Sequence, residues 1–236
     1  MELRNITKRF GNKTLLHKAI RCSVIFFIFL FIHLVVMMVN AKPGTTTEQS
    51  VIISESWYDI NHDGQKEKVE ILLEKGDRRA DAEEWCGNGE KWEGYFTIQV
   101  KKGDTVLSRQ SLNDLMFPFE KEHEPLSFWT PEFSLVFNDY NMDGQVDFNI
   151  GQYGSCNGNY YKLFTAKPDG TIFPLPIKYA EGIFVSPSKK LNSTGLIRIE
   201  KGLLTFKYYD NTVGKYLTAR YKWDKKEFVP TRKITK

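Results

Sequence analysis

The sequence predicts an all-β protein, an antiparallel meander built as a propeller-like fold or a sandwich. Three observations support this class. Apolar residues recur at every second position in one short run after another, which places them on one face of a strand. Turns that contain glycine separate these runs. Phenylalanine, tyrosine and tryptophan make up 14% of the 236 residues, a composition that suits a β-protein core.

The positions of these runs along the chain predict the individual strands. Residues 92–100 and 104–109 flank a glycine turn, which predicts a hairpin. Residues 160–164 and 171–173 flank a turn at 167–170, which predicts a second one. Six further strands and one short helix complete the prediction. In residues 216–223, apolar and polar side chains alternate, which predicts a strand with one face exposed to solvent. The strands are expected at 69–73, 132–137, 146–150, 202–209, 216–223 and 227–229, and the helix at 111–116.

A nine-residue acidic pattern, D-x-N-x-D-G-Q-x-[DE], occurs twice, in residues 59–67 (loop 1) and in residues 139–147 (loop 2). Alternate carboxylates and amides of such a loop can turn towards a hard cation. The glycine at position 6 permits a sharp turn, and position 7 offers its backbone carbonyl. Oxygen ligands of this kind predict calcium. The candidate metal residues are Asp59, Asn61, Asp63, Gln65 and Glu67 in loop 1, and Asp139, Asn141, Asp143, Gln145 and Asp147 in loop 2.

The sequence around the loops differs from that of an EF-hand. An EF-hand needs a helix on each side of its loop, whereas the flanks here are rich in β-branched and aromatic residues. Glu70 stands at position 12 of loop 1, but in a strand it would point away from the apolar face of residues 69–73. Glu67 is therefore favoured as the closing acid, without excluding Glu70. The alternative interpretation of both loops is an Asx-rich turn, formed only for local hydrogen bonds.

Strand, acidic loop and strand together carry a family resemblance. Residues 137–151, followed by 159–164 and 167–173, read D-x-N-x-D-G-x-x-D, then Y-x-x-[LF], then G-x-F. This unit resembles the calcium loops of FG-GAP/VCBS-type β-repeats, found in integrin-like propellers and many bacterial surface proteins. It is also similar to a set of bacterial periplasmic proteins, some of which inhibit lysozyme-like enzymes. The two loops start 80 residues apart, farther than in adjacent repeats.

The N-terminal part of the chain predicts export. Residues 22–39 form a long apolar run behind a basic segment, an asymmetry that keeps the N-terminus in the cytoplasm and sends the rest across the membrane. The small-residue pattern ending at Ala41 is one that signal peptidase cuts, so cleavage and membrane anchoring are both open. The predicted divisions are 1–21 (basic n-region), 22–41 (signal peptide or N-terminal anchor), 42–50 (polar tether) and 51–236 (one all-β domain).

Export changes the interpretation of the net charge. The chain has 33 basic and 29 acidic residues, but six of the basic residues and only one of the acidic ones lie in residues 1–41. The exported part is therefore nearly neutral, and the basic pI does not indicate nucleic-acid binding. Contact with a membrane is expected only through the N-terminal segment.

Two cysteines and three aromatic residues mark a candidate partner-binding surface. Cys86 and Cys156 are the two cysteines of the exported part, where an oxidising exterior favours a disulfide over two free thiols. Trp85 and Trp92 lie near the first cysteine and Tyr153 precedes the second. A disulfide would bring these aromatic side chains together as contact residues. The other interpretation is that both tryptophans pack beneath their loop.

No catalytic motif of a known kind occurs: the chain has no G-x-S-x-G elbow, H-E-x-x-H helix or P-loop. We therefore expect an exported, calcium-stabilised, non-catalytic binding or structural protein of a bacterial cell surface, with an unknown protein or glycan as partner. The first alternative is a proteinaceous inhibitor of a lysozyme-like cell-wall hydrolase. The second is an uncharacterised glycosidase, which would need two carboxylates facing each other across a cleft.

Overall fold

The computed structural model describes residues 50–80, 89–118, 124–155, 157–186 and 194–231, which belong to one compact unit. Antiparallel strands dominate these ranges, and the predicted all-β class is confirmed. The predicted export segment, residues 22–41, lies outside the described residues. Within the described ranges, no helix has the length and apolar character needed to cross a bilayer.

The strands form three sheets, which we call A, B and C. Sheet A is a meander of β1 (Val51–Tyr58), β2 (Glu67–Ala80), β3 (Glu90–Lys102) and β4 (Thr105–Ser111), with β5 (Leu126–Trp129) paired to β3. Sheet B consists of β6 (Val146–Ser155), β7 (Gly158–Ala166) and β8 (Ile172–Pro174), with β9 (Ile183–Val185) paired to β7. Sheet C is a meander of β10 (Arg198–Glu200), β11 (Leu203–Asp210), β12 (Lys215–Asp224) and β13 (Glu227–Pro230).

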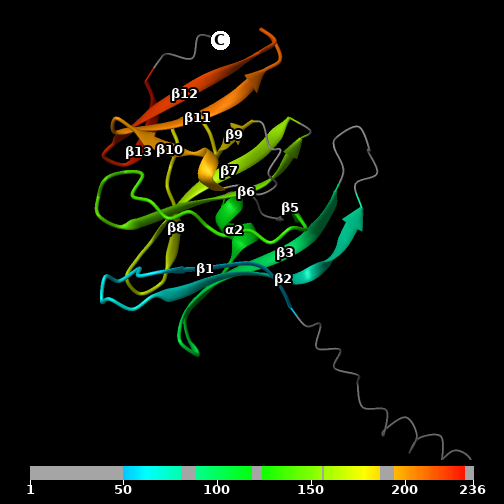
Figure 1. Ribbon diagram of the computed structural model, residues 1–236, viewed down its shortest axis with the longest axis vertical. Helices are drawn as coiled ribbons and strands as arrows, with labels where there is room; N and C mark the ends of the chain where they lie inside the picture. The colour runs from blue at the N-terminus through cyan, green and yellow to red at the C-terminus, as the bar shows by residue number, and fades with distance from the viewer. Residues whose placement is uncertain (1–49, 81–88, 119–123, 156, 187–193, 232–236) are drawn as a thin grey trace, which may run out of the picture. The chain divides into compact units, whose positions relative to one another are not determined.

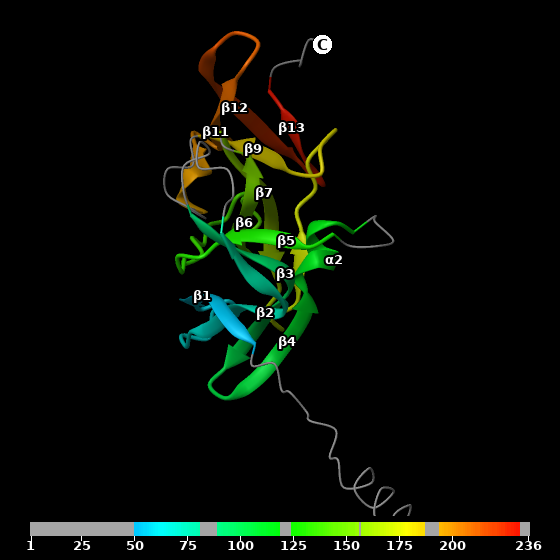
Figure 2. The same cartoon turned by 90° about the vertical axis from the view of Figure 1, so that its right-hand side faces the viewer.

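Sheet B lies between the other two sheets, because its two faces enter different cores. On β7, Phe164 and Ala166 belong to a first core shared with sheet A, whereas Tyr161 and Leu163 belong to a second core shared with sheet C. Figure 1 shows the three sheets one above another, and the turned view in Figure 2 keeps the same order. β6 and β7 of sheet B are therefore buried on both sides, while β12 alternates between half-buried and exposed residues, as predicted.

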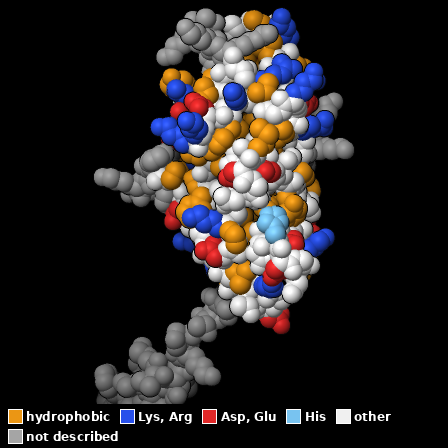
Figure 3. Space-filling view, turned by 90° about the vertical axis from the view of Figure 1, so that its left-hand side faces the viewer, with side chains coloured by type: hydrophobic (Ala, Val, Ile, Leu, Met, Phe, Trp, Pro, Cys, Tyr) orange, Lys and Arg blue, Asp and Glu red, His pale blue; other side chains and the backbone are white. Residues whose placement is uncertain are grey.

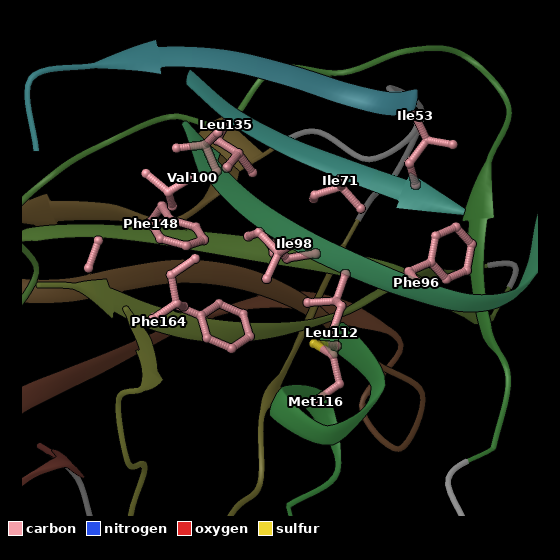
Figure 4. Close-up of a cluster of buried hydrophobic side chains, with 14 of the residues drawn as sticks. Ile53, Ile71, Phe96, Ile98, Val100, Leu112, Met116, Leu135, Phe148 and Phe164 are labelled. Carbon is pink, nitrogen blue, oxygen red and sulfur yellow. The ribbon is translucent and has the colours of Figure 1, made fainter. Parts of the chain in front are cut away.

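The first core holds sheets A and B together. Figure 4 shows Ile71 and Ile98 of sheet A in one cluster with Phe148 and Phe164 of sheet B. The two phenylalanine rings stack with their centroids 5.6 Å apart. Met116, from the short helix α2 (Leu112–Met116), enters the same cluster. Loop 1 belongs to sheet A and loop 2 leads into sheet B. Because this core joins the two sheets, it fixes the positions of the strands that carry both loops.

Most elements expected from the sequence are present, including both hairpins, α2 and the strands β11, β12 and β13 of sheet C. The strand expected at 132–137 is wrong: this segment makes a single isolated bridge, at Phe133, and the next bridge follows at Asn138. Its backbone is bonded to side chains of β1 instead. Leu135 donates its N–H to the Ser56 hydroxyl at 2.7 Å, and the Ser54 hydroxyl donates to the Phe133 carbonyl at 2.7 Å. Serine hydroxyls thus take the place of a regular ladder.

Candidate metal centre

Loops 1 and 2 project from the same side of the sheets. Loop 1 joins β1 to β2, and loop 2 leads into β6. Residues 133–137 run parallel to β1, and the rings of Tyr58 and Phe137 lie 4.8 Å apart between centroids. The chain therefore enters both loops from neighbouring positions, at the left of Figure 1. Figure 3 looks onto this side, where acidic and hydrophobic side chains lie close together.

The two loops share one set of hydrogen bonds. In loop 1 the Asp59 carboxylate accepts the backbone N–H groups of Asp63 at 3.0 Å and Gly64 at 2.9 Å. In loop 2 the corresponding distances from position 1 are 3.1 and 3.0 Å. In both loops the asparagine at position 3 also accepts the N–H of position 5, and the aspartate at position 5 accepts the N–H of position 7. The repeated motif therefore specifies one conformation in two places.

The backbone angles repeat as well. Gly64 and Gly144, at position 6, have φ of 86° and 83°. His62 and Met142, at position 4, have φ of 58° and 59°. Positive φ at position 6 favours glycine, since a Cβ there is strained even though no atom lies within 4 Å of it. Both loops therefore require glycine for its backbone rather than for space.

The acid at position 9 closes each loop from a buried position. Glu67 is 1% exposed and Asp147 is 0% exposed. One oxygen of each carboxylate accepts the N–H of position 2: Ile60 donates to Glu67 Oε2 at 2.8 Å, and Tyr140 donates to Asp147 Oδ2 at 2.7 Å. The other oxygen, Glu67 Oε1 or Asp147 Oδ1, is buried without a hydrogen-bond partner. Such an oxygen is costly to bury, so each loop holds an acceptor that a cation could satisfy.

Glu70, the other acid considered for loop 1, is engaged elsewhere in sheet A. Its carboxylate lies 2.7 Å from Lys68 Nζ and accepts a hydrogen bond of 2.6 Å from the Gln99 side chain. Lys101 Nζ lies 3.8 Å away. Although desolvation opposes it, this basic surrounding lowers the pKa of Glu70 below its usual value. Glu67 is thus the acid directed towards loop 1.

A lysine distinguishes the surroundings of loop 1 from those of loop 2. Lys102, at the end of β3, forms an ion pair with Asp63, and its Nζ lies 3.8 Å from Glu67 Oε1. Loop 2 has no counterpart: within the described ranges, no basic side chain forms an ion pair with Asp139, Asp143 or Asp147. Lys102 thus balances part of the acidic charge of loop 1 from within the protein, and among the described residues no ion pair does so in loop 2.

The pKa values reflect this difference. The hydrogen bond from Lys102 lowers the pKa of Asp63, and the same bond raises the pKa of Lys102. In loop 2, burial raises the pKa of Asp147 to about 6, and the nearby charge of Asp143 adds to the rise. The hydroxyl of Thr165, which faces Asp147 across the β6–β7 ladder, opposes this rise without forming a hydrogen bond of good geometry. The hydrogen bonds to the Asp147 carboxylate therefore do not fully offset the cost of burying its charge.

The donor set of each loop suits a hard cation such as calcium, which binds carboxylate, amide and carbonyl oxygens. Within the described residues, no three His, Cys, Asp or Glu side chains are placed so that they alone could hold a metal ion. A cation at either loop would therefore also need the asparagine at position 3 and the carbonyl at position 7. The internal hydrogen bonds equally meet the requirements of an Asx-rich turn. What such a turn leaves unexplained is the buried oxygen at position 9, which has no hydrogen-bond partner.

Of the predicted partner-binding residues, two are described. Cys86, Cys156 and Trp85 lie outside the described residues. Trp92 is half-buried against the first core, with the Arg78 guanidinium 5.9 Å from its ring centroid. Tyr153 is also half-buried and belongs to a different cluster. That cluster contains Trp129, whose ring centroid is 5.2 Å from that of Tyr153, and Lys91, whose Nζ lies 3.8 Å from the Tyr153 centroid.

Trp92 and Tyr153 therefore do not share one surface. Lys91 and Trp92 are consecutive residues of β3, so their side chains point to opposite faces. Since Lys91 contacts Tyr153, Trp92 lies on the other face of the strand. The described structure thus leaves Tyr153, with Trp129 and Lys91, as the aromatic cluster beside the end of β6.

Two features of the molecule were not anticipated from the sequence. The first is Lys102, which belongs to loop 1 in space but lies 35 residues after it in the chain; counting the register of the β2–β3 hairpin would have been the only signal. The second is an open groove of about 880 Å³ along sheet C. Its lining includes Phe206, Tyr208, Arg220 and Tyr221, together with Phe184 of β9.

Comparisons with protein-family models, with curated proteins and with solved structures each find no match to this chain.

Proposed function

We propose that the protein is an exported, non-catalytic binding or structural protein of a bacterial cell surface, whose β-fold is stabilised by calcium at the acidic loops. The observation that carries this proposal is the buried oxygen without a hydrogen-bond partner at position 9, present at equivalent places in both loops. A turn formed only for its own hydrogen bonds has no need for this acid to be ionised and buried. A bound cation gives it a partner.

The residues present define how calcium would be held. The carboxylates of positions 1 and 5, the amide oxygen of position 3, the carbonyl of position 7 and the free oxygen of position 9 supply the ligands. Calcium would connect the start of β2 or β6 to the turn before it. Extracellular loops of this type bind at about 10⁻⁴–10⁻³ M, a range in which the ion is available outside the cell.

The non-catalytic part of the proposal rests on how the buried acids are used. Glu67 and Asp147 hold backbone N–H groups of their own loops, and Glu70 is paired with lysine and glutamine. His62 is exposed at position 4 of loop 1. These groups serve structure, and none of them faces a second acid in a manner typical of glycoside hydrolysis.

For a partner, the Tyr153 cluster is the more suitable of the two predicted aromatic sites. Trp92 contributes to the first core, so its replacement would disturb the fold as well as any contact. Tyr153 stands at the edge, next to a positive charge at Lys91. An aromatic ring of this kind suits a contact with a protein or glycan. Inhibition of a lysozyme-like hydrolase would use the same cluster, and a panel of cell-wall hydrolases tested with wild type and Tyr153→Ala measures it directly.

The test of the proposal is a thermal melt of the full-length protein in EDTA, followed by melts with millimolar calcium or magnesium. In 10 mM calcium, roughly ten to 100 times the expected dissociation constant, stability rises by about 1.4–2.7 kcal/mol. For a domain of this size that corresponds to roughly 3–10 °C. We expect calcium to produce this rise and magnesium a smaller one.

A double variant and a matched control complete the test. Asp63→Ala/Asp143→Ala should abolish the calcium response. Asp169→Ala removes an acid that accepts the Thr171 N–H in a turn outside both loops, and it should keep the full response. If the double variant and wild type melt at the same temperature in millimolar calcium, calcium does not stabilise this fold.

A further inference from the structure

We infer that the two loops are not equivalent: Lys102 supplies loop 1 with an internal cation, so loop 2 is the calcium-responsive loop and wild-type protein binds calcium with a stoichiometry of one. This inference rests on the proposed calcium function and specifies how that function is divided between the loops. The inference rests on which side chain lies across the β-ladder from the acid at position 9 of each loop.

Lys102 occupies the acidic groups that calcium would need in loop 1. Its ammonium pairs with Asp63 and lies 3.8 Å from Glu67 Oε1, the oxygen that lacks a hydrogen bond. These are two of the ligands expected for a metal, from positions 5 and 9. A divalent cation added there would be repelled by the ammonium at close range, or would have to displace it from a site that is partly buried.

Register shows that loop 2 differs at the corresponding place. In the β2–β3 ladder Lys68 pairs with Lys101, so the next step of the antiparallel register sets Lys102 across from Glu67. In the β6–β7 ladder Thr165 pairs with Asp147. Lysine and threonine therefore stand at equivalent positions opposite the two closing acids. One carries a positive charge to its loop, and the other carries only a hydroxyl.

Loop 2 consequently has the same oxygens without a cation among the described residues. Asp139, Asp143 and Asp147 repeat the geometry of loop 1, and Asp147 is fully buried with one oxygen unpartnered. The loop carries three acidic side chains, and a cation bound there would reduce the repulsion among them. Because the protein supplies none by an ion pair, a calcium ion from solution has the larger effect here.

The experiment is a calorimetric calcium titration of the full-length protein, wild type and variants. Wild type should bind one calcium ion. Asp143→Ala should lose this binding, and Asp63→Ala should retain it. Lys102→Gln removes the charge and keeps a side chain of similar reach, and it should add a second site by strengthening loop 1 on the order of tenfold or more. Lys102→Arg, which keeps the charge, is the matched control and should still bind one ion.

A reciprocal variant makes the result independent of Lys102. Thr165→Lys places an ammonium opposite Asp147 and should weaken calcium binding at loop 2 by a similar factor. If this variant does not fold, the Lys102 pair alone decides the question, because Lys102 is partly exposed at a strand end and tolerates replacement.

The outcomes separate this inference from the function on which it rests. Two sites of equal affinity in wild type, or one site in both wild type and Lys102→Gln, would overturn the inference and leave calcium binding intact. A lack of calcium binding in wild type and in every variant would overturn the calcium function itself, and the inference with it.

Discussion

Loops 1 and 2 have the same backbone and different electrostatic surroundings. Their hydrogen bonds agree within 0.2 Å at position 1, their glycines have φ of 86° and 83°, and both close with a buried acid. What differs is the strand beside them. β3 brings a lysine to loop 1, whereas β7 brings a threonine to loop 2.

A metal-loop motif therefore specifies geometry but not charge balance. The residues of the motif build the turn through contacts only a few positions apart. The electrostatic field at the site also depends on charged side chains of the neighbouring strand. The nine residues of the motif do not contain this information. The following predictions test the difference, beginning with the largest effect.

Single aspartate substitutions at position 5 should separate the loops in millimolar calcium. In 10 mM calcium, roughly ten to 100 times the expected dissociation constant, we expect Asp143→Ala to lose about 1.4–2.7 kcal/mol of stability, because the calcium contribution disappears. Asp63→Ala should lose at most about 1 kcal/mol, because it breaks an ion pair between partly exposed groups. Chemical denaturation of both variants measures the difference. Equal losses would show that the loops respond alike.

Replacing the acid at position 9 by its neutral amide should change the stability in EDTA in opposite directions in the two loops. Asp147→Asn removes a buried charge that has no ion pair, so we expect a gain of about 1–2 kcal/mol. Glu67→Gln removes a charge that Lys102 partly balances, so we expect a loss of about 1 kcal/mol. Both variants keep an acceptor for the N–H of position 2. A loss in both would mean that Asp147 is compensated as well as Glu67.

Stability in EDTA should depend on pH through Asp147. Because its folded-state pKa of about 6 lies above its ordinary value of 3.8, the unfolded chain releases this proton first. The contribution is present at low pH and is lost as pH rises through about 6, with a slope of at most about 1.4 kcal/mol per pH unit. Asp63 and Glu70, whose pKa values are lowered, act in the opposite direction.

The Asp147 contribution is therefore measured as a difference. The unfolding free energy of wild type minus that of Asp147→Asn should fall between about pH 4 and pH 6.5, and calcium should reduce this fall. A difference that does not change with pH would show that Asp147 titrates normally.

Glycine replacement should have the same effect in both loops. Gly64→Ala and Gly144→Ala place a Cβ in open space at positive φ, so each should cost about 1 kcal/mol through backbone strain alone. Thermal melts in EDTA provide the measurement. A clear inequality would mean that the backbones of the loops differ, contrary to their shared hydrogen bonds.

Sequence reasoning was strongest where structure is local. The hairpins of β3–β4 and β7–β8, the helix at 112–116 and the alternation in β12 all follow from turn residues and periodicity over a few positions. It failed at 132–137, where the apolar residues alternate but the backbone is hydrogen-bonded to serine side chains of β1 instead of to another strand. Whether a partner strand exists depends on which segment lies alongside, and periodicity does not contain that information.

The sequence by itself determined the all-β class and the two acidic loops, because both depend on residues that are neighbours in the chain. Only the tertiary structure decided that sheet B is buried on both faces, that Glu67 and Asp147 are buried, and that Trp92 and Tyr153 belong to different surfaces. It also decided that Lys102 reaches Asp63, 39 residues away. The physical reason is that burial and charge compensation depend on strand pairing and sheet stacking, which join residues far apart in sequence.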